Sequence, residues 1–309
     1  MAAWAWIPIV VWAAFAQTVR NATQRSLTAE VGTLPATLVR FLYGLPFAAL
    51  WLAALYAFMG ADTGPLPAFH APYFAWIAAG ALAQFAATAL LLLAMKERNF
   101  IVAVTYSKTE VLQVALFGTL FLGELPGWLS ALAMLAATAG VLLLARPAKP
   151  AAATSPGAPP TRWLGRTALY GLGSGAGFAL SSVGYRGAAL ELGGLSPWLI
   201  GAWGVLWAQA LQSLLLGGWL AARNPAGLRA ILTAWRLSAM AGAMGALASI
   251  GWFTAFSLRP AADVRTLGLV EVIFSFLVSH RLFRERLGGT ELAGLALVTA
   301  GLLVVCAQL

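Results

Sequence analysis

The sequence contains little charge and almost no side chains suited to metal or redox chemistry. Asp, Glu, Lys and Arg make up 9% of its 309 residues. A single cysteine, Cys306, excludes an internal disulfide and a cysteine metal site. The two histidines, His70 and His280, lie far apart, and the sequence has no HExxH pair and no Walker loop. We therefore expect no metal, no cofactor and no enzyme activity, and a primary pump is disfavoured.

What the sequence has instead is apolar residues. They make up 61% of it, and the mean hydropathy is +0.83. A soluble domain is about 45–50% apolar, so the composition predicts an integral membrane protein surrounded by the lipid bilayer. The net charge of +9 arises from basic residues in short loops beside the apolar runs. This placement favours a role in membrane orientation and not nucleic-acid binding.

Apolar runs of about 20 residues, the length that crosses a bilayer, predict ten spanning helices. The runs cover residues 3–19, 34–58, 71–95, 99–122, 126–145, 165–185, 195–221, 237–257, 261–280 and 288–307. We therefore predict an all-α membrane fold of two five-helix domains, 1–145 and 165–309. A proline- and alanine-rich linker, 146–164, joins them.

The two halves repeat each other with a shift of 161 residues. This shift carries Glu110 onto Glu271 and Glu124 onto Glu285 without a gap. Charged matches are informative in a chain with so few charges. Because five is an odd number of crossings, the second half must enter the membrane from the opposite side. The sequence therefore predicts an inverted-topology repeat.

The glutamates Glu110 and Glu271 lie near the centres of apolar runs, where a carboxylate costs about 2.5–3.5 kcal/mol on insertion scales. Low-dielectric surroundings disfavour the charged form, so either glutamate can take up and release a proton during transport. The other interpretation is structural pairing with Lys108 or with hydroxyl groups. Lys108 points about 200° away from Glu110 on a continuous helix, so we expect it to reach Glu271. Two carboxylates and one ammonium give a net charge near −1, which attracts a proton or a cationic group.

Other polar side chains in the apolar runs are candidates for a binding site. Arg40 either snorkels to the interface or clamps a carboxylate or phosphate group of a substrate. Arg265 is assigned, with Asp263, to a gate or an interfacial ion pair. The remaining candidates that face a cavity are Gln17, Gln84, Tyr106, Gln113, Tyr185 and Trp252. Trp252, with Trp203 and Trp207, either lines an aromatic pocket or packs in the core.

A recurring pattern in the two halves resembles a known family. The first half has Glu110-Val111-Leu112, then Gly123-Glu124-Leu125, and the second has Glu271-Val272-Ile273, then Arg284-Glu285-Arg286-Leu287. With Arg40-Phe41, this pattern resembles the EamA-type ten-helix proteins of the drug/metabolite transporter superfamily. The family has a proline after each glutamate, where this chain has Val111 and Val272. The resemblance implies a transporter of small molecules.

The favoured hypothesis is a secondary transporter in the bacterial inner membrane. It would export a small organic metabolite or drug by alternating access, with possible proton coupling, as a monomer or homodimer. The alternative is a structural or lipid-handling membrane protein without an aqueous pathway for a substrate.

The orientation follows from the loop charges, because basic residues concentrate on the cytoplasmic side. Fourteen basic residues lie on the linker side of the apolar runs and three on the other. We predict a cytoplasmic linker and external termini. Reporter fusions at Ser155 should therefore be active only as cytoplasmic reporters, and fusions at Asp62 only as external ones. The reverse pattern would overturn the orientation.

Overall fold

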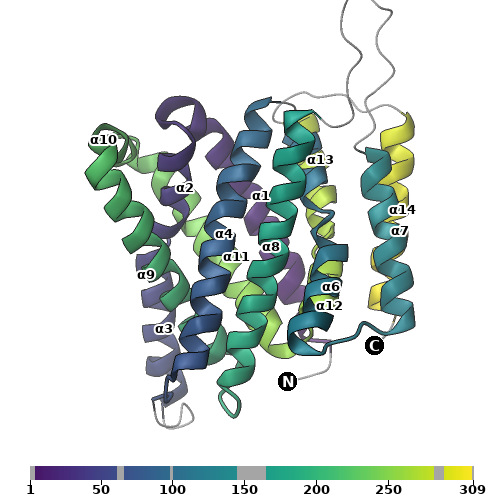
Figure 1. Cartoon of the computed structure of the whole chain (residues 1–309), viewed down its shortest axis with the longest axis horizontal. Helices are drawn as coiled ribbons and strands as arrows, with labels where there is room; N and C mark the ends of the chain where they lie inside the picture. Colours follow the sequence, from purple (N-terminus) through teal and green to yellow (C-terminus); the bar gives the residue numbers. More distant parts are fainter. Residues whose placement is uncertain (1–3, 61–65, 98–99, 145–164, 282–288, 308–309) are drawn as a thin grey trace, which may run out of the picture.

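The computed structural model describes residues 4–60, 66–97, 100–144, 165–281 and 289–307, and it is all-α in these ranges. The predicted linker, 146–164, and Glu285 lie outside the described residues. The helices, shown in Figure 1, are α1 (Trp6–Val31), α2 (Thr33–Leu42), α3 (Leu45–Met59), α4 (Ala71–Glu97), α5 (Phe100–Ser107), α6 (Glu110–Leu122), α7 (Trp128–Leu144), α8 (Arg166–Glu191), α9 (Pro197–Arg223), α10 (Pro225–Thr233), α11 (Trp235–Leu258), α12 (Ala261–Leu267), α13 (Val270–Arg281) and α14 (Gly289–Cys306).

Four helical segments are long and apolar enough to cross a membrane. They are Thr33–Met59, which comprises α2 and α3, together with Ala71–Glu97, Pro197–Arg223 and Trp235–Leu258. These segments indicate an integral membrane protein. Both ends of the chain lie at the same end of the bundle in Figure 1.

The first helix is longer than the sequence predicted. The predicted segment ended at residue 19, with Arg20 and Arg25 in the following loop, but α1 continues to Val31. Assigning these two arginines to a loop was therefore wrong. Polar residues in this part of α1 are buried against other helices, so hydropathy alone ended the segment too early.

The short helix α10 was also not expected, since its residues were assigned to a loop. Its start has a local cause. The side chain of Asn224 accepts a hydrogen bond from the Gly227 amide at 2.9 Å, and Pro225 occupies the first turn. Both features favour helix initiation. In the same way, the Ser196 hydroxyl caps the long helix α9.

Two of the predicted spanning segments are broken near their centres. The segment 99–122 divides into α5, which ends at Ser107, and α6, which begins at Glu110. The segment 261–280 divides into α12, which ends at Leu267, and α13, which begins at Val270. Each break lies directly before or beside one of the two repeated glutamates. The breaks form although valines stand where a proline would interrupt the helix.

Hydrogen bonds of the 3₁₀ type replace the regular α-helical pattern at both breaks. The Val111 amide donates to the Lys108 carbonyl at 3.4 Å, and the equivalent Val272 amide donates to the Leu269 carbonyl at 2.9 Å. The Thr109 hydroxyl donates to a carbonyl three residues earlier at 2.9 Å. Such bonds redirect the backbone locally and change the directions in which nearby side chains point.

Pairs of helices from the two halves of the chain pack along each other. α4 lies along α8, α1 along α11, and α7 along α14. The broken helices also exchange contacts, because α6 touches α12 and α5 touches α13. At the α4–α8 contact, a Cβ added at Gly184 would lie 2.9 Å from the Cα and the nitrogen of Gly80. Glycine at this position lets the two backbones touch.

This contact predicts that Gly184→Ala destabilises the protein. The added methyl group meets backbone atoms that cannot rotate away, so we expect a loss of about 1–3 kcal/mol in the free energy of unfolding. Gly218→Ala in α9 is the matched control, because a Cβ there meets no atom within 4 Å. It should be neutral or stabilising by up to about 1 kcal/mol, from helix propensity. Unfolding of the purified protein in detergent would test both variants, and equal effects would contradict the close packing of α4 and α8.

Candidate functional site

The interior of the bundle contains a cluster of charged side chains, each between 0 and 4% exposed. We call this set the charged core, and its members are Arg20, Arg40, Lys108, Glu110, Arg265 and Glu271. They come from α1, α2, α6, α12, α13 and the break before α6. Burial of charge on this scale requires specific partners, because an unpaired ion loses its hydration without compensation.

Glu271 is the most fully satisfied member of the charged core. Its Oε2 atom accepts hydrogen bonds from Lys108 Nζ and Gln17 Nε2, both at 2.5 Å. Its Oε1 atom accepts from Asn21 Nδ2 at 2.9 Å. The predicted reach of Lys108 to Glu271 is thus confirmed. The contacts join α1, α13 and the break before α6 around one carboxylate.

Glu110 lies on the other side of Lys108. Its Oε1 atom accepts a hydrogen bond from Arg265 Nη2 and lies 3.7 Å from Lys108 Nζ. On a continuous helix Lys108 and Glu110 would point in different directions. The break between α5 and α6 brings them to the same place, so Lys108 lies between the two repeated glutamates.

The expected interfacial ion pair of Arg265 with Asp263 was wrong, whereas the alternative assignment to a gate stays a prediction. The Arg265 guanidinium points into the core, where it binds Glu110 and lies 4.5 Å from the centre of the Trp252 ring. Asp263 instead accepts a hydrogen bond from Ser130 at 3.0 Å. The two side chains diverge because α12 turns each towards a different neighbour.

Gln17 links the aromatic side of the site to the carboxylates. Its Oε1 atom accepts a hydrogen bond from Trp252 Nε1 at 2.9 Å, while its Nε2 atom donates to Glu271. Trp252 therefore contacts both Gln17 and Arg265. A single bonded chain runs from α11 through α1 to α13.

A second polar network surrounds Arg40. The Arg40 Nη1 atom donates to the Thr88 hydroxyl at 2.9 Å. One helical turn before Thr88, Gln84 Oε1 accepts from the Tyr185 hydroxyl at 2.9 Å and from Gln212 Nε2 at 3.0 Å. These bonds connect α2, α4, α8 and α9, so Arg40 is anchored in the interior and does not snorkel to an interface.

A narrow central cavity lies between the two networks. Its volume is about 10 Å³, which is room for roughly one water molecule. Its lining includes five of the predicted site residues together with Arg265, and the full lining is Gln17, Arg40, Gln84, Phe178, Ser181, Ser182, Tyr185, Ser249, Trp252, Phe253, Phe256 and Arg265. Charged, polar and aromatic side chains thus converge on one point.

Not all predicted site residues reach this cavity. Tyr106 packs against Gly171 of α8, and Gln113 is half-buried on α6. Neither lines the cavity, and the predicted Lys108, Glu110 and Glu271 do not line it either. Trp203 and Trp207 also lie elsewhere, in a cluster with Phe69. Of the three tryptophans proposed for an aromatic pocket, only Trp252 lines the central cavity.

The predicted net charge near −1 was wrong. It counted two carboxylates and one ammonium, whereas the charged core also contains Arg20, Arg40 and Arg265. Four cations against two carboxylates give a net charge of +2. The sequence contained a sign that Arg20 is buried. A polar residue recurs at the spacing of one helix face, at Gln17, Arg20, Asn21 and Gln24.

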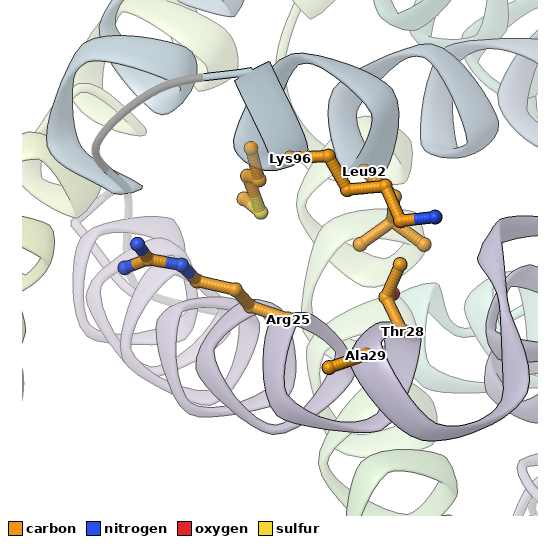
Figure 2. A pocket seen from close by; sticks show the side chains of 6 residues that line it. Arg25, Thr28, Ala29, Leu92 and Lys96 are labelled. Carbon is orange, nitrogen blue, oxygen red and sulfur yellow. The ribbon is translucent and has the colours of Figure 1, made fainter.

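Two larger cavities lie outside the charged core. Figure 2 shows one of about 230 Å³, in which Arg25 and Thr28 of α1 face Leu92 and Lys96 of α4. Another, of about 390 Å³, has an apolar lining formed by Pro8, Ile9, Trp12, Trp51, Trp198, Leu247, Ile250 and Gly251. Neither reaches the glutamates.

The fold and the site together define an all-α integral membrane protein with a charged core. The sequence matches no protein-family model and no curated protein. Eighteen chains of solved structures match it. One of them, titled "Crystal structure of protein", is 18% identical, with a TM-score of 0.66 over 98% of this chain and 96% of its own. This likeness shows the fold.

Proposed function

We propose that the protein is a secondary transporter that exports a small organic metabolite or drug across the bacterial inner membrane by alternating access. The observation that carries this proposal is the charged core. Ionisable groups at membrane depth are expensive, and they commonly mark a pathway for ions or substrates. Two of them, Arg40 and Arg265, line the central cavity, and the two glutamates lie at the breaks of interrupted helices. Interrupted helices are a usual setting of a transporter site.

We further propose that ten helices form two inverted five-helix repeats of the EamA type, in the drug/metabolite transporter superfamily. Helix packing supports this part of the proposal. The shift of 161 residues carries α4 onto α11 and α8 onto α1, and the pairs α4–α8 and α1–α11 both pack along their lengths. The same shift relates the contact of α6 with α12 to that of α13 with α5. Such exchange of contacts is expected around a pseudo-twofold axis.

Alternating access requires the central cavity to open towards each side of the membrane in turn. At about 10 Å³ the cavity holds no organic substrate, so the helices around it must separate during a cycle. Small residues favour such movement. At the contact of α11 with α1, Gly251 faces Ala13, and on α8 Gly177 faces Ala87 of α4. Flat surfaces of this kind can slide or part with little interlocking.

Reaction of cysteines with a water-soluble thiol reagent tests the pathway. In a Cys306→Ala background, Ser249→Cys places a thiol in the cavity, and Leu214→Cys places one on the 72% exposed outer surface of α9. We expect membrane-impermeant reagent to modify Ser249→Cys from each side of oriented proteoliposomes. Leu214→Cys should stay unmodified, because lipid disfavours the reactive thiolate. Protection of Ser249→Cys from both sides would favour the structural or lipid-handling alternative.

Proton coupling would act through the same core. A proton on Glu271 would neutralise the partner of Lys108 and so release the ion pair beside the helix break. We expect Glu271→Gln to fold and to remove the pH dependence of transport in proteoliposomes, because glutamine keeps the shape and cannot carry the proton. Glu124→Gln is the control, since Glu124 pairs with Arg186 at a helix end. An unchanged pH profile in both Glu271→Gln and Glu110→Gln would leave transport driven by the substrate alone.

A further inference from the structure

We infer that the central cavity binds an oxyanion, a carboxylate or phosphate group of the substrate, between Arg40 and Arg265. This inference rests on the proposed transport function and names the class of its substrate. It extends the sequence-based alternative in which Arg40 clamps a carboxylate or phosphate group, and it departs from the expectation that the glutamates attract a proton or cationic group.

The charged core holds more cationic groups than carboxylates. Both carboxylates of the charged core have cationic partners, Glu271 in Lys108 and Glu110 in Arg265 and Lys108, although the Glu110 Oε2 atom has no hydrogen-bond partner among the described residues. Among the described residues, no ion pair is found for Arg20 or Arg40. The nearest partners of these two are neutral, the Asn21 side chain at 2.6 Å and the Thr88 hydroxyl at 2.9 Å. A net charge of +2 therefore lies uncompensated in the interior.

The arginines of the charged core also hold unused hydrogen-bond donors. The Nε atoms of Arg20, Arg40 and Arg265, and the Nη1 atom of Arg20, are buried without a hydrogen-bond partner among the described residues. Buried guanidinium donors normally find partners, because an unsatisfied charged donor is costly. Arg40 and Arg265 both line the cavity, so an acceptor placed there would meet two of these groups.

Arg20 and Arg40 lie close together beside α11. A Cβ added at Gly245 would lie 3.3 Å from Arg20 Cδ and 3.3 Å from Arg40 Cγ. The stems of both arginines therefore pack against one glycine of α11 and bring two like charges together. Repulsion between them opposes this arrangement unless an anion lies nearby. Guanidinium groups match carboxylate and phosphate oxygens geometrically, which favours an oxyanion over a spherical anion.

Aromatic side chains also line the cavity. Trp252 and Phe256 have nearly parallel rings 6.4 Å apart, and Phe253 lies 4.0 Å from the Tyr185 ring. The site thus pairs a cationic end with an apolar wall. Once the surrounding helices separate, this combination suits an organic anion better than a fully hydrated inorganic one.

The experiment measures thermal unfolding of the full-length protein in uncharged detergent at constant ionic strength. Probes are sodium phosphate, acetate and benzoate, with sodium chloride, benzamide and choline chloride as references. We expect at least one oxyanion to raise the Tm by about 5 °C near saturation, whereas the references do not. A Tm shift with phosphate alone would indicate a phosphate group on the substrate, and a shift with acetate or benzoate alone would indicate a carboxylate group. No shift with any oxyanion, or an equal shift with benzamide or choline, would overturn the inference.

Arg40→Gln is the decisive variant. It should lose the oxyanion shift, with affinity reduced about tenfold or more, while its Tm without oxyanion stays equal or rises. A structural arginine would instead lower that Tm when removed, so a variant that unfolds or fails to fold counts against the inference. Arg20→Gln should weaken the shift. Arg229→Gln, on the exposed face of α10, should keep the full shift.

Transport by proteoliposomes separates this inference from the proposed function. An Arg40-dependent oxyanion shift without flux would support the site and count against transport. Flux of a neutral or cationic compound, in a protein that no oxyanion stabilises, would overturn the oxyanion site and leave the transporter standing.

Discussion

The cost of holding charge inside an apolar bundle is the constraint on which this structure depends. A carboxylate at membrane depth must have partners that replace water. Lys108, Gln17 and Asn21 supply them for Glu271, and Arg265 supplies one for Glu110. These partners come from different helices, so pairing the two glutamates fixes the relative positions of α1, α6, α12 and α13.

Much of the fold follows from hydropathy and self-similarity. Apolar runs predict the positions of most helices. The pairing of Lys108 with Glu271 was expected because Lys108 and Glu110 point in different directions on a continuous helix. The ends of the helices were harder to predict from the sequence. The end of α1 was placed too early because its polar residues are buried by neighbouring helices and not exposed to water. The start of α10 depends on a cap at Asn224, a local signal that hydropathy does not register.

The composition of the site was predicted only in part. Arg40, Gln84, Gln17, Tyr185 and Trp252 were identified as polar or aromatic residues within apolar runs, and all line one cavity. The positive net charge of the charged core was not predicted, because Arg20 and Arg265 lie near the ends of predicted segments. Residues at such ends are expected to contact water. Tertiary contacts decide whether such an arginine lies outside or inside, and helical periodicity in α1 was the one local clue.

The partners of each glutamate belong mainly to the opposite half of the chain, which has a consequence for biosynthesis. Arg265 follows Glu110 by 155 residues, and Gln17 precedes Glu271 by 254. While the first half leaves the ribosome, Glu110 has no Arg265 beside it. The early helices must therefore enter the membrane before their charges are fully balanced. Completion of the chain then closes the network, so release of a full-length product and formation of its interior coincide.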